Sequence, residues 1–197
     1  MIYNSFDLIK IDAARIDETC NAYFKWKDLN TYIQNQSHRG INMPDAISEP
    51  MGCFCLGLMW NRGDAVGDAT DKSGRKIEFK ATSRFEGDLS SFGPKCEFDD
   101  LVFLRFKLDE NLLYVYDLHL DSREFGKYPA NRNETIDDQK RQGRRPHVSL
   151  LDLFVNQSSL EPDVVFDIRR CKIIEDNRKT KSYKLLPPSR TFPGKGR

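Results

Sequence analysis

The sequence predicts an α/β fold in which a central mixed β-sheet is flanked by helices. Three observations support this prediction: apolar residues recur at helical spacing over 12–34, β-rich runs with turn signals follow between 66 and 120, and short helical and strand patterns fill 135–176. With 197 residues, 39% of them hydrophobic, the chain is long enough for one well-buried core. We expect residues 1–176 to form a single domain and 177–197 a basic C-terminal tail.

The first two helices are predicted from apolar spacing and helix-start signals. Asp12 is suited to cap a helix that runs to about Gln34. A second apolar stripe follows Pro44, and Pro50 lies within it, so this helix either starts or kinks at Pro50. The apolar positions are Ile16, Cys20, Tyr23, Phe24 and Tyr32 in the first helix, and Ala46, Ile47, Met51, Phe54, Cys55 and Leu58 in the second.

A β-hairpin is predicted over residues 64–83, which contain the stretch VGDATDKSGRKIEFKATS. Strand side chains alternate with a period of two, so Ile77, Phe79 and Ala81 enter the core while Glu78 and Lys80 lie together on the other face. The turn signal DKSG at 71–74 would bring Asp68 back beside Glu78.

The remaining elements follow from shorter patterns. The runs DDLVFLRFKL (99–108) and LLYVYDLHL (112–120) predict a second hairpin that extends the same sheet. TIDDQKRQG (135–143) and SLLDLFVNQ (149–157) are typical of helices, with Ser149 as a cap, and DVVFDI and CKIIED predict two short strands. The polar, proline-containing tail, 177–197, is expected to be mobile or ordered by a partner.

Several function classes find no support in the sequence. No membrane span or export signal is visible, and five cysteines without metal-ligand spacing favour a reduced cytoplasmic setting in which each is a small buried apolar residue. His38, His119 and His147 are too scattered for a ββα-metal nuclease. Ser-His-Asp, P-loop and dinucleotide-binding arrangements are not found.

Charge is distributed unevenly along the chain. Residues 1–125 hold 15 Lys and Arg against 21 Asp and Glu, a net charge of −6, whereas residues 126–197 hold 16 against 9, a net charge of +7. The basic half is suited to face a polyanion. A solvated surface with a loose basic tail would give the same charge pattern.

The predicted hairpin carries the residue types that cut a phosphodiester. Two carboxylates at one end of a sheet suit Mg²⁺, and an adjacent ammonium can position or deprotonate a metal-bound water and stabilise charge on a phosphate. Asp68, Glu78 and Lys80 supply these groups, and the carbonyl of Phe79 is a further candidate ligand. An ordinary solvent-facing pair of Glu78 and Lys80 on an amphipathic strand would show the same pattern.

The hairpin resembles the PD-(D/E)xK nuclease motif, with GD at Gly67 and Asp68 in place of Pro-Asp and with the second half intact as EFK. Longer blocks over 38–155 resemble the Bsp-six-I family of type II restriction endonucleases. These blocks are RGINMPDAISEPMGCF (39–54), KATSRFEGDLSSFGPKCEFDDLVFLRF (80–106) and DDQKRQGRRPHVSLLDLF (137–154). The first 37 and the last 40 residues contribute nothing to this resemblance.

The resemblance implies a PD-(D/E)xK core and a Mg²⁺-dependent homodimer, with Mn²⁺ as a substitute metal. Such an enzyme cuts double-stranded DNA at a short GC-rich palindrome of the GCNGC type and is guarded by a partner methyltransferase. Asp68 and Glu78 would be metal ligands and Lys80 the catalytic lysine. Glu49 is a candidate additional acid, although an ordinary surface acid on a helix is the simpler interpretation. Ser83 would orient the lysine or meet a phosphate, unless it is an ordinary strand-end hydroxyl.

Two segments are candidates for contact with DNA. In the loop GDLSSFGPK (87–95), backbone N–H groups and polar side chains would reach the DNA backbone, unless the loop is an ordinary connection. The segment KRQGRRPH (140–147), within a DNA-reading segment over 137–155, has arginine forks that match guanine O6 and N7, although phosphate contact alone would also explain it. We favour a combination, in which some residues of this segment read bases and others contact the DNA backbone. The candidate side chains are Ser90, Ser91, Lys95, Lys140, Arg141, Gln142, Arg144, Arg145 and His147.

Three hypotheses of function follow. The first is a site-specific restriction endonuclease. The second is a structure-specific or repair nuclease of the same fold, which would cut junctions or damaged duplex. The third is a non-catalytic DNA-binding protein, against which the intact EFK argues.

Overall fold

The computed structural model describes residues 8–37, 39–63, 67–180, 185 and 187–188. Its strands are β1 (Leu8–Lys10), β2 (Met59–Asn61), β3 (Ala69–Thr70), β4 (Lys76–Thr82), β5 (Ser90–Ser91), β6 (Asp100–Lys107), β7 (Leu112–Asp117), β8 (His147–Val148), β9 (Val164–Asp167) and β10 (Lys172–Asp176). Its helices are α1 (Ala13–Gln36), α2 (Asp45–Leu56), α3 (Ser122–Gly126), α4 (Ile136–Arg141) and the π-helix η1 (Leu151–Asn156).

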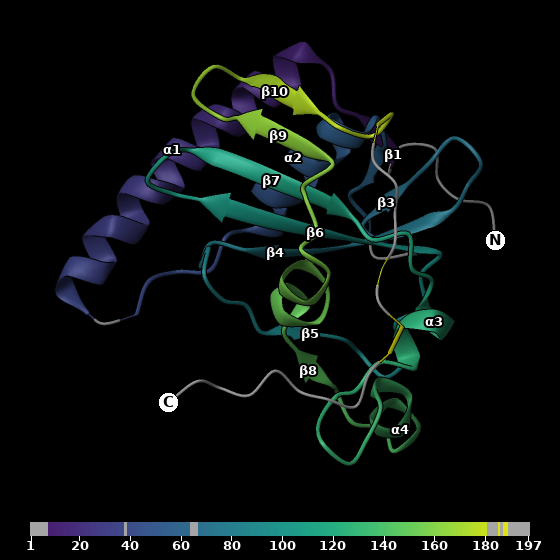
Figure 1. Ribbon diagram of the computed structural model, residues 1–197. Helices are drawn as coiled ribbons and strands as arrows, with labels where there is room; N and C mark the ends of the chain where they lie inside the picture. The colour runs from purple at the N-terminus through teal and green to yellow at the C-terminus, as the bar shows by residue number, and fades with distance from the viewer. Residues whose placement is uncertain (1–7, 38, 64–66, 181–184, 186, 189–197) are drawn as a thin grey trace.

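An eight-stranded sheet forms the centre of the molecule, in the order β1–β2–β3–β4–β6–β7–β9–β10 (Figure 1). The neighbours β4 and β6 run parallel, whereas the other paired neighbours run antiparallel. Helices and loops cover both faces. The prediction of a central mixed sheet flanked by helices is therefore confirmed, and the arrangement is consistent with a restriction-endonuclease-like fold.

One face of the sheet is covered by the long helix α1 and by α2. The Asp12 side chain accepts a hydrogen bond from the Arg15 N–H, which is the predicted cap. Ile16, Cys20 and Tyr23 pack into the core on this face, but Tyr32 is 64% exposed. The apolar stripe of α1 therefore ends before Tyr32, because the last turns of α1 extend past the sheet (Figure 1).

Helix α2 begins at Asp45 and runs through Pro50, so it does not start at the proline. Within the helix Pro50 removes one hydrogen bond, to the Ala46 carbonyl, and the buried stripe around it compensates for this loss. Gly52 lets α2 approach the sheet closely, since a Cβ at this position would lie 2.8 Å from Cε1 of Phe79. The backbone of α2 is thus held directly over β4.

The two predicted hairpins are both present. Strand β3 pairs antiparallel with β4, and β6 pairs antiparallel with β7 around the turn at 108–111. Ile77 and Phe79 are buried as predicted, but Ala81 is exposed and lines a polar cleft. Strand β1 was not predicted, whereas β9 and β10 match the two short strands predicted from the sequence.

The other face holds a second apolar core beneath η1, α3, α4 and the two-stranded sheet β5–β8. These elements gather below the sheet in the view of Figure 1. The Asp88 carboxylate fixes the start of the helical segment: its oxygens accept hydrogen bonds from the Leu150 and Leu151 N–H groups at 2.9 and 3.0 Å and from the Ser149 hydroxyl. The hydroxyl of Ser149 in turn accepts from the Asp152 N–H, so Ser149 acts as the predicted cap.

Other predictions concern the cysteines, the tail and membrane spans. All five cysteines are free, and Cys20, Cys53 and Cys55 are buried while Cys96 and Cys171 are half-buried. Most of the predicted basic tail lies outside the described residues, as do His38 and residues 64–66 of the predicted hairpin. Among the described helices, none combines the length and the apolar character needed to cross a membrane.

Candidate active site at the β3–β4 hairpin

Asp68 is held at the start of β3 by backbone hydrogen bonds on both sides. Its N–H donates to the Ile77 carbonyl, and its carbonyl accepts from the Asn61 N–H, both at 2.9 Å. Across the hairpin, the Asp68 carboxylate accepts a hydrogen bond of 2.7 Å from the Phe79 N–H. The hairpin therefore returns Asp68 to the strand that carries Glu78, as predicted.

Gly67 explains why the GD dipeptide departs from Pro-Asp. Its φ is +70°, in the left-handed region, which the proline ring cannot reach. A Cβ at Gly67 would also lie 3.2 Å from the Ile77 carbonyl oxygen. The glycine thus permits the turn that delivers Asp68, and a proline would not fit this backbone.

Glu78 and Lys80 lie on the face of β4 opposite to Phe79 and form an ion pair of 2.5 Å. This pair is not solvent-facing, because its side chains are only 13% and 22% exposed. Burial by itself would lower the pKa of Lys80, but the charges of Glu78 and Asp68 and the hydrogen bond to Glu78 raise it above its ordinary value. The lysine ammonium also lies 5.1 Å from the centre of the Phe92 ring. Lys80 is therefore a half-buried, positively charged group.

Glu49 reaches the same neighbourhood from α2. Its carboxylate accepts a hydrogen bond of 2.8 Å from the indole N–H of Trp60. Burial and then the charge of Asp68, with a smaller contribution from Glu78, raise the pKa of Glu49 to about 7. These interactions place Glu49 beside the hairpin carboxylates, so it is not an ordinary surface acid.

Asp68 and its neighbours form a cluster with excess negative charge. Burial first, and then the charge of Glu78, raise the pKa of Asp68 to about 6, although the hydrogen bond from Phe79 and the charge of Lys80 act in the opposite direction. Asp45, which the sequence analysis did not single out, adds to the repulsion at Asp68 and at Glu49. A divalent cation would relieve this repulsion, and carboxylates are the ligands that Mg²⁺ prefers.

The carbonyl of Phe79 is directed to the same side. The N–H and C=O of one strand residue project towards the same neighbouring strand, and the Phe79 N–H points at Asp68. Asp68, Glu78 and this carbonyl therefore offer an all-oxygen donor set, and the residues present fit a hard divalent cation.

A polar cleft of about 450 Å³ runs beside Lys80. The predicted residues Ser83, Ser90 and Ser91 line it, although Ser90 is buried and its hydroxyl donates to Asp88 at 3.0 Å. An adjoining cleft shares Asn42, Ser83 and Arg84 with it and adds Arg39. Neither Asn42 nor Arg84 was predicted, since each is a single polar residue outside any motif.

The two segments predicted to contact DNA form one surface. Strands β5 and β8 pair antiparallel, with Ser91 opposite His147. The Phe92 N–H donates to the Pro146 carbonyl at 3.1 Å, and Arg145 lies 3.5 Å from the Ser91 hydroxyl. Because the Phe92 ring also contacts Lys80, this surface is continuous with the catalytic hairpin.

The basic side chains of the reading segment, residues 137–155, already have partners within the chain. Lys140 donates to the Cys96 carbonyl at 2.6 Å, and Arg141 pairs with Asp138 at 2.5 Å. Arg144 pairs with Glu134, which also accepts from Gln142. Among the remaining candidates, Lys95 and His147 are exposed. The acidic partners in these ion pairs, Asp138 and Glu134, were not among the predicted site residues.

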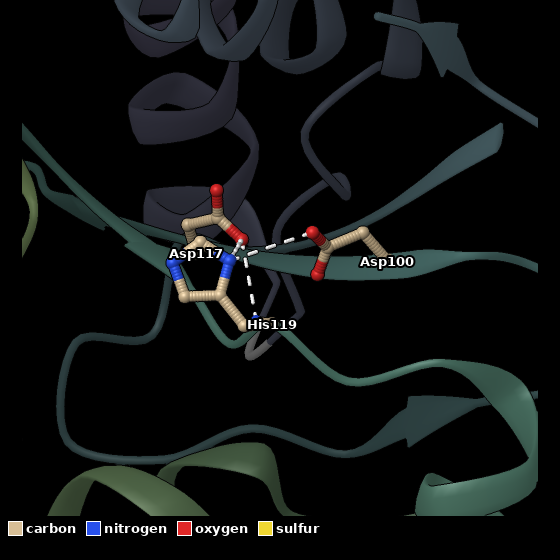
Figure 2. Close-up of side chains that lie close together, drawn as sticks. All are labelled: Asp100, Asp117 and His119. Atoms are coloured by element: carbon tan, nitrogen blue, oxygen red, sulfur yellow. Dashed lines mark hydrogen bonds and ion pairs between the residues drawn. The ribbon is translucent and has the colours of Figure 1, made fainter. Parts of the chain in front are cut away.

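A second cluster of ionisable groups lies at the beginning of β6 and just after β7. The Nδ1 atom of His119 lies 3.2 Å from Asp117 and 3.5 Å from Asp100 (Figure 2). The Asp100 carboxylate also pairs with Arg75 at 2.9 Å. Among the described residues this is the group of three potential metal ligands whose donor atoms all lie within 4.8 Å of one another. Burial and the charge of Asp100 raise the pKa of Asp117 to about 7. We interpret the cluster as an ion-pair network, because Arg75 and His119 already compensate the two carboxylates.

Two comparisons with known proteins, with a family model and with a single relative, lead to the same family. The family described as Bsp6I restriction endonuclease, written Bsp-six-I above, matches residues 11–157. The chain is 39% identical over 170 residues to the type II restriction enzyme Bsp6I of Bacillus sp. (strain RFL6), an alignment that covers 86% of this chain and 97% of that relative. No solved structure shows a significant match. The similarity begins at residue 11 and so includes α1, which the resemblance found in the sequence did not cover.

Proposed function

This chain belongs to the Bsp6I restriction endonuclease family and is a type II site-specific deoxyribonuclease, and from this premise we propose that it cuts double-stranded DNA in a Mg²⁺-dependent reaction at a GC-rich palindrome of the GCNGC type. Mn²⁺ would substitute for Mg²⁺. The observation that carries the proposal is the convergence of Asp68, Glu78 and Lys80 at one end of the β3–β4 hairpin.

In the proposed reaction, Asp68, Glu78 and the Phe79 carbonyl would hold the cation. When bound there, the ion would supply Lewis-acid stabilisation of the phosphate and a lowered pKa of the attacking water. Glu49 extends the carboxylate cluster towards α2, and its raised pKa lets it hold a proton near neutral pH. Asp68 stays in place because the Phe79 N–H fixes its carboxylate.

Lys80 acts in this scheme as a charged donor. Since its pKa is raised, it is an ammonium at neutral pH, and it can donate to the attacking water or to a phosphate oxygen on which charge develops. A lysine that stays protonated is a weak general base. Its proposed role is therefore to position the attacking water and to stabilise charge on the phosphate. The ion pair with Glu78 fixes the position of the Lys80 ammonium for this role.

DNA would lie along the cleft beside Lys80 and over the β5–β8 surface. Ser83, Ser91 and Lys95 are suited to phosphate contact, together with Lys140 and Arg141. Arg144, Arg145, Gln142 and His147 are proposed to face the bases, where arginine forks recognise guanine. The buried Ser90 supports the loop through Asp88 rather than meeting DNA.

The biological setting is part of the same proposal. A palindromic site is matched by a two-fold dimer that presents one active site to each strand. A methyltransferase that modifies the same site would protect the host, without a stable complex, and both proteins would act in the cytoplasm. Residues 1–176 would form the nuclease unit and 177–197 a separate basic tail.

The decisive experiment is digestion of a plasmid of known sequence, followed by mapping of the cut ends. We expect discrete fragments that end at one palindromic sequence in the presence of Mg²⁺ or Mn²⁺, and no cleavage in excess chelator. Cleavage confined to junctions or damaged duplex would indicate a repair nuclease. Binding without cleavage under any metal condition would indicate a non-catalytic DNA-binding protein, and a particle that stays monomeric on DNA would refute the dimer.

A further inference from the structure

Glu134 lies just before α4 and is the centre of a side-chain network at the reading segment. Its carboxylate accepts hydrogen bonds from Asn131 at 2.9 Å, from Gln139 at 3.1 Å and from Gln142 at 3.2 Å, and it forms an ion pair with Arg144. Four side-chain donors thus converge on one acidic group. Among the described carboxylates of residues 137–155, none gathers side chains that are suited to read bases.

The backbone around Glu134 is fixed as well. The Glu134 carbonyl accepts from the N–H groups of Ala130 and Asn131, and its own N–H donates to the Asn131 side chain at 2.9 Å. At the far end of the network, the Arg144 N–H donates to the Gln139 carbonyl at 3.0 Å. Glu134 and its partners are therefore held in one arrangement before any DNA arrives.

An ionised carboxylate restricts the orientation of its partners, because it can accept hydrogen bonds but cannot donate them. The amides of Gln139 and Gln142 must turn their N–H₂ groups towards Glu134, which leaves their carbonyl oxygens directed away from it. Arg144 uses one terminal nitrogen, Nη2, for Glu134. Its guanidinium carries five N–H donors in a planar fork, so it can bind Glu134 and still present donors to guanine O6 and N7.

Glu134 is ionised throughout the range in which nucleases act. The hydrogen bond from Asn131 first, followed by those from Arg144 and Gln139, lower the pKa of Glu134 to about 2. The side chain of Arg144 is 46% exposed, so the guanidinium remains accessible to a ligand while it is paired.

We propose that Glu134 is a specificity-determining positioning residue, which orients Arg144 and Gln142 so that they meet the bases of the target site. This inference rests on the proposed function, because it assumes that the reading segment contacts DNA. An alternative role for the same contacts is competition, in which Glu134 occupies Arg144 and must be displaced by phosphate. The two roles predict opposite effects when the carboxylate is removed.

The test is a binding titration of Glu134→Ala and Glu134→Gln in Ca²⁺, with one duplex that contains the site mapped for the parent protein and one scrambled duplex. We expect affinity for the site to fall about 5- to 100-fold, the range of one bidentate base contact, and affinity for the scrambled duplex to stay equal or rise slightly. Arg144→Ala introduced into Glu134→Ala should then cause little further loss of preference, because the two residues act together.

The matched control is Glu124→Gln, which removes an exposed carboxylate of α3 that pairs with Lys127, the residue directly after that helix. It should keep the parent's preference. Thermal unfolding identifies a variant that fails to fold, and Glu134→Gln keeps the side-chain size if Glu134→Ala is destabilised. An unchanged preference in both folded variants, or an equal gain on both duplexes, overturns the inference. If the parent itself shows no preference, the proposed function fails instead.

Discussion

The carboxylates of the catalytic hairpin and those of the reading segment differ in the direction of their pKa shifts. At the hairpin, burial and neighbouring acids raise the pKa of Asp68 to about 6 and that of Glu49 to about 7. In and beside the reading segment, hydrogen bonds from the chain itself lower the pKa of Glu134 and of Asp138 to about 2. Carboxyl groups of the same small protein thus have raised pKa values in one region and lowered pKa values in the other.

The difference shows which charges the chain balances by itself. At the hairpin, the acids repel one another and the Lys80 ammonium lies among them, so a divalent ion would reduce the repulsion that remains. At the reading segment, Arg141 and Arg144 each have an acidic partner, so the surface is ordered before it binds. The hairpin carboxylates therefore repel one another within the chain, whereas the acids in and beside the reading segment are already paired.

The largest expected effect that tests this comparison is loss of cleavage in Asp68→Asn and Lys80→Ala. Each substitution removes a group that is proposed to contact the metal or the phosphate, so cleavage should fall by roughly 100-fold or more, because several kcal/mol of transition-state stabilisation is lost. Initial rates on the mapped site measure this effect. Lys72→Ala, in the exposed turn of the same hairpin, is the control and should cut at the parent's rate.

Both variants should remain folded. Asp68→Asn removes a charge from a cluster with excess negative charge, so its thermal unfolding midpoint in chelator should equal or exceed that of the parent. Cleavage at the parent's rate by either variant would show that the active site lies elsewhere.

A second, smaller effect concerns pH and stability. The pKa values of Asp68 and Glu49 are raised in the folded state, so their contribution to stability is complete below their unfolded values near pH 4 and is lost as the pH rises through about 6 to 7. The metal-free protein should therefore be less stable above pH 7 than below pH 6. Ca²⁺ should restore roughly 1–3 kcal/mol above pH 7 and much less below pH 6, where the carboxyls are protonated.

Thermal unfolding with and without Ca²⁺, at one pH above 7 and one pH below 6, measures this effect. Asp117 also has a pKa near 7, so the informative quantity is the difference between the parent and Asp68→Asn, in which the dependence on Ca²⁺ should be much weaker. Glu134 and Asp138 do not titrate in this range. Equal stabilisation by Ca²⁺ at both pH values would contradict the assignment of the cation to the hairpin.

The smallest expected effects distinguish residues within the reading segment. Arg144→Ala should cost about 1–3 kcal/mol on the specific duplex and much less on a scrambled one, as expected for a bidentate base contact. Arg141, whose side chain is 74% exposed, should behave as a phosphate contact. Arg141→Ala should weaken binding to both duplexes equally and reduce the salt dependence by about one unit.

Titrations at two salt concentrations in Ca²⁺ separate these outcomes. Asp138→Asn, which loses the partner of Arg141, serves as the comparison variant for that pair. If Arg144→Ala and Arg145→Ala both bind the two duplexes like the parent, base reading must lie elsewhere, first in the loop 87–95.

The sequence alone was sufficient for the local features of the catalytic hairpin. Alternation in β4 predicted the opposite faces of Phe79 and Lys80, and the turn signal at 71–74 predicted the return of Asp68. The capped helix α1 and the hairpin β6–β7 were also predicted. These features depend on interactions between residues that lie close together in the chain, and the periods of strands and helices fix them without reference to the rest of the fold.

The tertiary structure alone decided what surrounds that hairpin. Glu49 joins the cluster because α2 packs over β4 through Gly52, and the pairing of β5 with β8 brings the loop 87–95 to the reading segment. Parallel pairing of β6 with β4, the course of α2 through Pro50 and the exposed Ala81 likewise had no local signal. Such contacts depend on which surfaces the whole chain buries against each other, and burial also sets the pKa values of Asp68 and Glu49, so neither follows from a single segment.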